Sequence, residues 1–78
     1  MNITLKPLTV YVDFNQEADI VSITVKNETG EVALGPLVHH FCSTQEDWRA
    51  SINDHIAQLV HRGMNIVALE SNASGIKL

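Results

Sequence analysis

The amino-acid sequence predicts an α+β fold in which a single four-stranded mixed sheet carries one helix on one face. Three features of the sequence point to this fold. Ser43 to Gly63 places apolar residues at helical spacings and has helix signals at both ends. The segments before it alternate apolar and polar residues, as strands do, and a short apolar run follows it. The element order is therefore β-β-β-α-β, and a meander plus one crossover gives the sheet order 3-2-1-4.

The first two strands are expected near the start of the chain. Leu8 to Phe14 alternates cleanly, and Pro7 separates it from a short edge piece, Asn2 to Lys6, because proline cannot donate to a β ladder. Ile20 to Lys26 is the second strand. Its residues that face the core are Val21, Ile23 and Val25.

The third strand follows a tight turn, Asn27 to Gly30, in which Gly30 can adopt a positive φ. This strand is expected over Glu31 to Phe41 and is interrupted by Gly35-Pro36. Since proline removes one hydrogen bond from the ladder, the strand should lie at an edge of the sheet or contain a bulge.

The helix should begin at a capping box, in which the Ser43 hydroxyl and the Glu46 carboxylate each accept a hydrogen bond from the other residue's backbone N–H. It should end at Arg62 and Gly63, a cation near the last carbonyls and a residue free to become left-handed. The apolar stripe consists of Trp48, Ile52, Ile56, Leu59 and Val60. We expect Trp48 to anchor this stripe in the core.

The fourth strand is expected at Asn65 to Glu70. Its centre is apolar on both faces, which suits a strand that runs parallel to its neighbour. Residues 1–70 should form one domain. Residues 71–78 contain two serines, an asparagine and a glycine, and we expect them to form a flexible tail.

Length, charge and cysteine content narrow the class of function. A chain of 78 residues buries only about 60% of its unfolded surface, which favours oligomerisation or a partner. The single Cys42 allows no internal disulfide and indicates a reducing compartment. The sequence shows no signal peptide and no membrane-spanning run, so a cytoplasmic protein is expected. A net charge of −4 and scattered basic residues argue against nucleic acid as a partner.

Three carboxylates, those of Asp13, Glu46 and Glu70, converge in the predicted topology. The first and fourth strands run parallel, so Asp13 and Glu70 lie at one end of the sheet, and the first helical turn returns Glu46 to that end. Such a set suits a divalent metal ion. Its placement resembles the ribonuclease H-like fold, and that resemblance implies a metal-dependent nuclease. The preferred interpretation is structural, with Asp13 and Glu70 ending strands and Glu46 completing the cap.

A second group of residues has zinc-ligand chemistry: His39-His40-Phe41-Cys42 together with His55. Neighbours in a strand point to opposite faces, so only one of the two adjacent histidines can join Cys42, and the alternative metal set is His40, Cys42 and His55. His55 also lies on the apolar stripe, where a core histidine bonded to a carbonyl is the preferred interpretation. Cys42 near a helix N-terminus is an alternative reactive thiol, paired with His40. We predict no metal and no cofactor.

One face of the predicted sheet has no helix to cover it. It should carry Tyr11, Ile20, Thr24 and Phe41, with one of Ile66 or Val67, and is more apolar than a solvated face needs to be. We therefore predict a small non-enzymatic interaction protein, an inhibitor, antitoxin or regulatory subunit. It should bind another protein, as a homodimer or heteromer, through Tyr11, Ile20, Thr24 and Phe41. The alternative is a minimal ribonuclease H-like nuclease.

Size and charge add an analogy to this prediction. Antitoxins of the HicB type use a non-catalytic version of the ribonuclease H-like core, and this chain is similar to them in size. Compact acidic proteins are also common among phage-encoded inhibitors of host defence, anti-CRISPR proteins included. Both likenesses imply that the chain acts by binding a partner protein.

Overall fold

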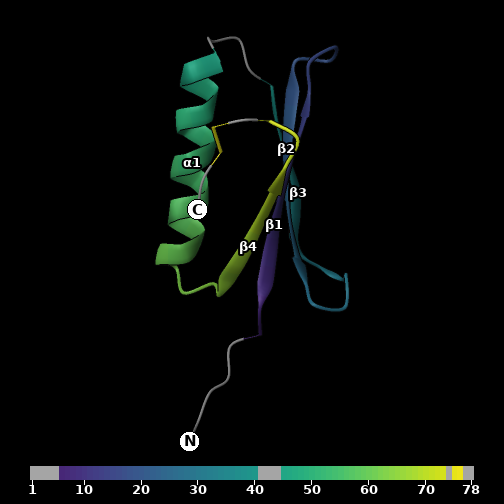
Figure 1. Ribbon diagram of the computed structural model, residues 1–78, viewed down its shortest axis with the longest axis vertical. Helices are drawn as coiled ribbons and strands as arrows, with labels where there is room; N and C mark the ends of the chain where they lie inside the picture. The colour runs from purple at the N-terminus through teal and green to yellow at the C-terminus, as the bar shows by residue number, and fades with distance from the viewer. Residues whose placement is uncertain (1–5, 41–44, 74, 77–78) are drawn as a thin grey trace, which may run out of the picture.

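The computed structural model describes residues 6–40, 45–73 and 75–76. Within them the chain forms β1 (Leu8–Asn15), β2 (Ile20–Asn27), β3 (Val32–His40), α1 (Gln45–His61) and β4 (Ile66–Ser71). The strands make one sheet in the order β3-β2-β1-β4, and α1 lies on one side of it (Figure 1). The α+β fold and the sheet order predicted from the sequence are confirmed.

The two inner strands set the register of the sheet. β1 pairs antiparallel with β2, so that Val10 lies opposite Val25 and Val12 opposite Ile23. On its other side β1 runs parallel to β4, and Val10 also lies beside Leu69. Because paired residues share a face, these apolar side chains form one continuous layer beneath α1.

The core lies between this layer and the apolar stripe of α1. Val60, expected in that stripe, is 48% exposed and does not belong to the core. The buried residues of the core are Val10, Val12, Val21, Ile23, Val25, Trp48, Ile52, Ile56 and Leu59. All of them come from β1, β2 and α1, whereas β3 and β4 supply only partly buried side chains at the rim. Each such side chain, when fully buried, contributes about 1.5–3 kcal/mol. No polar or charged side chain of the described residues is fully buried.

Trp48 closes the core at the N-terminal end of α1. It is 4% exposed, and its ring stacks on Phe14 of β1 with the centroids 4.8 Å apart and the planes at 10°. The guanidinium carbon of Arg49 lies 5.6 Å from the Trp48 ring centroid. The expected role of Trp48 as the anchor of the stripe is confirmed.

The C-terminus of α1 is a Schellman motif. The N–H of Met64 donates to the carbonyl of Leu59 at 3.2 Å, and the N–H of Gly63 donates to Val60 at 3.0 Å. Gly63 has φ +94°, as this motif requires. The predicted capping box at the other end cannot be compared in the same way, because Ser43 and the side chain of Glu46 lie outside the described residues.

Gly35 and Pro36 interrupt β3, which is an edge strand as the sequence predicted. Gly35 has φ +94°, and a Cβ there would lie 2.6 Å from the carbonyl oxygen of Ile23. Only glycine fits such a close backbone approach. The pairing of β2 with β3 shifts register between Ile23 and Val25, which is a bulge.

The C-terminal segment, expected to be a flexible tail, packs back on the domain wherever it is described. It returns from the end of β4 toward α1 (Figure 1). The amide of Asn53 in α1 donates to the carbonyl of Gly75 at 3.0 Å. Ala73 and Ile76 pack against the core. These contacts hold Ala73, Gly75 and Ile76 on the face that α1 covers.

We expect Trp48→Ala to lower the free energy of unfolding by about 3–5 kcal/mol, because it removes a large buried ring and leaves a cavity beside Phe14. Urea denaturation measures the change. Val60→Ala is the control, since Val60 is on the same helix and 48% exposed, and it should change stability by less than about 0.5 kcal/mol. A loss below about 1 kcal/mol for Trp48→Ala would contradict its place in the core.

Candidate functional site

The face of the sheet opposite α1 is here called the open face. The alternation of side chains and the pairing of strands define its residues. They are Thr9, Tyr11 and Asp13 of β1, Ile20, Ser22, Thr24 and Lys26 of β2, Val32, Val38 and His40 of β3, and Ala68 and Glu70 of β4. No described helix covers this face (Figure 1).

The structure places three of the four predicted partner-binding residues on the open face. Tyr11, Ile20 and Thr24 are half-buried there, whereas Phe41 lies outside the described residues. The sequence predicted that either Ile66 or Val67 of β4 lies on the uncovered face. In the structure Ile66 packs against the core, and Val67 is 54% exposed beside the register shift of that strand. Sequence periodicity could not separate these two, because β4 is apolar throughout its centre.

Two valines of β3 lie on the open face although the sequence did not predict them there. Val32 and Val38 are 53% and 52% exposed, and they pair with Lys26 and Ser22 on the open face. The bulge at Gly35-Pro36 decides which residues of β3 face outward, and its effect on register cannot be derived from alternation alone.

A basic residue reaches across the open face. Nζ of Lys26 lies 5.1 Å from the centroid of the Tyr11 ring, which fits a cation–π contact. Thr24 pairs with Tyr11 across β1 and β2. The centre of the face therefore combines an aromatic ring, a hydroxyl and a cation beside the exposed valines of β3.

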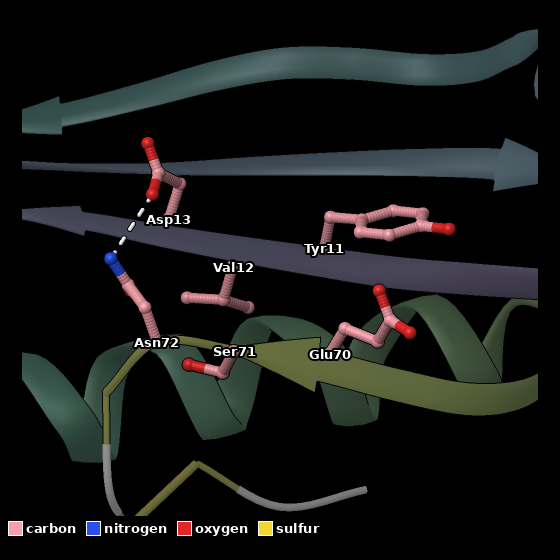
Figure 2. Close-up of a pocket in the computed structure, with 6 residues that line it drawn as sticks. All are labelled: Tyr11, Val12, Asp13, Glu70, Ser71 and Asn72. Atoms are coloured by element: carbon pink, nitrogen blue, oxygen red, sulfur yellow. Dashed lines mark hydrogen bonds between the residues drawn. The ribbon is translucent and has the colours of Figure 1, made fainter.

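A shallow hollow of about 270 Å³ lies at the β1–β4 end of the open face. It is lined by Tyr11, Val12, Asp13, Glu70, Ser71 and Asn72. Figure 2 shows Tyr11 and Glu70 projecting from neighbouring strands, with Asp13 farther along β1. Asp13 and Glu70 both line this hollow, but Glu70 pairs with Tyr11 and Asp13 lies two residues farther along β1, so the convergence of the three carboxylates stays a prediction.

Asn72 closes the end of this hollow. Its side-chain oxygen accepts a hydrogen bond from the N–H of Phe14 at 2.8 Å, and its amide nitrogen donates to the Phe14 carbonyl at 3.0 Å. The same nitrogen donates to Oδ1 of Asp13 at 3.1 Å (Figure 2). The Asn72 side chain therefore pairs with β1 as a strand backbone would, and it holds the Asp13 carboxylate in place.

Glu46 belongs to α1, which packs on the other face of the sheet. The sheet therefore lies between α1 and the side chains of Asp13 and Glu70. The Glu46 side chain is outside the described residues, and within those residues no three His, Cys, Asp or Glu side chains gather around a possible metal position.

The structure does not bring His40 and His55 together. His40 pairs with Ile20 on the open face, whereas His55 extends from α1 toward the covered face. His39 pairs with Val21, a core residue, and its ring centroid lies 5.9 Å from that of His55. Side chains alternate between the two faces along β3, so His39 faces His55 in place of the predicted His40. Cys42 lies outside the described residues.

The environment of His55 lowers its pKa below the ordinary value of 6.5. Desolvation by burial is the largest cause, followed by repulsion from His39 and then Arg62, while Asp54 acts in the opposite direction. Nε2 of His55 is shielded from solvent and has no hydrogen-bond partner among the described residues. The neutral imidazole is therefore the form that this site favours.

We expect stability to fall in weak acid because of His55. Its folded pKa is lowered, so the unfolded chain binds the proton more tightly, and stability present above about pH 6.5 is lost as the pH falls below it. Urea midpoints of the metal-free chain between about pH 7.5 and 5.5 measure the loss. His55→Phe should reduce this dependence, and His61→Phe, an exposed residue of the same helix, should leave it intact. An unchanged slope in His55→Phe would contradict the assignment.

Comparisons with protein-family models, with curated proteins and with solved structures find no match to this chain. No helix in the described part is both long and apolar enough to cross a membrane.

Proposed function

We propose that this chain is a small non-enzymatic interaction protein that acts by occupying the surface of a partner protein. Inhibitors, antitoxins and regulatory subunits are the classes that work in this way. One observation carries the proposal: α1 covers one face of the sheet, and the open face exposes Val32 and Val38 by more than half, at 53% and 52%. Exposed apolar side chains gathered on one face mark interaction surfaces.

The chemistry of the open face supports a protein as the partner. Tyr11 offers an aromatic body with a polar tip, the type of side chain enriched at the centre of protein interfaces. Asp13, Glu70 and Lys26 lie around it and can form a polar rim. The chain carries a net charge of −4, which disfavours a nucleic-acid backbone as the occupant.

The outer strands offer a second mode of contact. β3 is interrupted by Gly35-Pro36, which blunts it as a template. β4 contains no proline and is the more available outer strand, although its register with β1 shifts at the exposed Val67. Backbone groups on the free side of β4 can pair with an added strand. A homodimer formed there would extend the sheet across a two-fold axis, and a heteromer would use the same edge.

The expected cellular compartment and the similarity in size and charge to small binding proteins support the same proposal. A single Cys42 suits a reducing compartment, so we place the protein in the cytoplasm. The chain is similar in size to HicB-type antitoxins, and in size and charge to phage-encoded inhibitors such as anti-CRISPR proteins. In each of these classes the activity is partner binding.

The ribonuclease H-like alternative draws on one observation, the presence of Asp13 and Glu70 in one hollow. Titration with Mg²⁺ or Mn²⁺ separates the two functions. Saturable binding that Asp13→Asn and Glu70→Gln both abolish, together with nucleic-acid cleavage, would favour the nuclease. Under the interaction proposal these variants leave the fold and partner binding largely intact, because both carboxylates lie at the rim.

We expect Val38→Glu to weaken association with the partner protein, or with a second copy, by at least about tenfold, because it buries a charge in the interface. Val60→Glu is the matched control: it introduces the same charge on α1, where Val60 is 48% exposed against 52% for Val38. Sedimentation velocity measures self-association, and capture of the partner from the native host measures binding.

Thr24→Lys and Tyr11→Lys should act like Val38→Glu, since both residues lie on the open face. Circular dichroism checks that each variant is folded. The proposal fails if the open-face variants associate normally while Val60→Glu, Asp54→Lys or Gln58→Lys on the exterior of α1 prevents association.

A further inference from the structure

Two imidazoles from distant parts of the chain meet at the rim of the covered face. His39 extends from β3 and His55 from α1, and their ring centroids are 5.9 Å apart with the planes at 70°. His39 is exposed, whereas His55 is half-buried. The pair is therefore reachable from solvent on the side of His39 and shielded on the side of His55.

The separation of the rings suits a shared metal ion. A transition metal lies about 2.0–2.1 Å from a histidine nitrogen, and the ring centre is about 1.2 Å farther on, so each centre lies about 3.2 Å from the metal. At a tetrahedral angle two such rings have centres about 5.2 Å apart. The observed 5.9 Å lies within about 1 Å of that separation, a difference that a small change in the rotamer of the exposed His39 can supply.

His55 also has coordinating capacity that the described protein does not use. Its Nε2 is shielded from solvent and makes no hydrogen bond with the described residues. A buried polar atom left in this way costs about 1–3 kcal/mol. A bound metal ion would satisfy it, because the neutral imidazole nitrogen is the commonest metal ligand in proteins.

We propose that His39 and His55 together bind a divalent transition-metal ion of the Zn²⁺ type between β3 and α1. Imidazole ligands suit Zn²⁺ and Ni²⁺ and disfavour Mg²⁺ and Ca²⁺, which prefer oxygen. The described residues place no third His, Cys, Asp or Glu at the pair, so they supply two ligands and leave the other coordination positions open to water. The charged groups of α1 that act on His55 are Asp54 and Arg62, and their effects on a cation oppose one another.

Such an ion would fasten an edge strand to the helix. β3 contributes no fully buried side chain to the core, so it is held mainly by its pairing with β2. Coordination by His39 and His55 would add a direct link from β3 to α1. Binding should therefore raise the melting temperature, as any ligand of the folded state does.

The chain supplies its own matched controls, because its four histidines comprise this pair and two others on the same elements. His40 follows His39 on β3 but lies on the open face, and His61 is exposed in the last turn of α1. Calorimetric titration of the full chain with Zn²⁺, and separately with Ni²⁺, should show saturable binding of one ion. His39→Ala and His55→Leu should each weaken it by at least about tenfold, whereas His40→Ala and His61→Ala should not.

His39→Ala keeps the test sound if His55→Leu fails to fold, because His39 is exposed and its removal leaves the core intact. Circular dichroism confirms the fold of each variant, and the melting temperature with and without Zn²⁺ gives an independent reading. In Cys42→Ser, which removes the thiol, Zn²⁺ binding should still depend on His39. The proposal is overturned if the wild-type chain binds neither ion, or if His39→Ala binds as tightly as the wild type.

Discussion

The packing of one helix against the two inner strands is the constraint on which the rest of this structure depends. Ile56 of α1 and Val10 and Val25 of the sheet are completely buried at 0% exposure. The chain has a single described helix, so this packing can cover only one face of the sheet. The helix on one face excludes water from the core and leaves the other face to solvent or to a partner. Antiparallel sheets with one solvated side show the same division.

Contacts at the ends of the elements fix the residues that surround this core. The stack of Trp48 on Phe14 ties the start of α1 to β1, and the Schellman motif at Gly63 directs the chain into β4. Asn72 then bonds back to β1 beside Asp13. The hollow on the open face and the histidine pair on the covered face therefore both lie on elements that build the core, and Val12 belongs to the hollow as well as to the core.

The sequence was sufficient for the fold because its patterns are local. Alternation placed Val21, Ile23 and Val25 inward, and the Gly63 stop signal ended α1. Long-range registers were not accessible in this way. That His39 rather than His40 faces α1 depends on the pairing with Val21, and the role of Asn72 depends on a contact 58 residues away in sequence. That Asp13 and Glu70 line one hollow follows from the parallel pairing of β1 and β4. That the sheet separates these two side chains from α1, the helix that carries Glu46, required the structure.

Methyl NMR of the valines, in the presence of a soluble gadolinium chelate that broadens exposed signals, tests the one-sided packing most directly. The protected methyls should be those of Val10, Val12, Val21 and Val25, and the broadened ones those of Val32, Val38, Val60 and Val67. On association, Val32 and Val38 should become protected while Val60 stays broadened. Protection of Val38 in the dilute, isolated chain, or protection of Val60 in place of Val38 on association, would contradict the account.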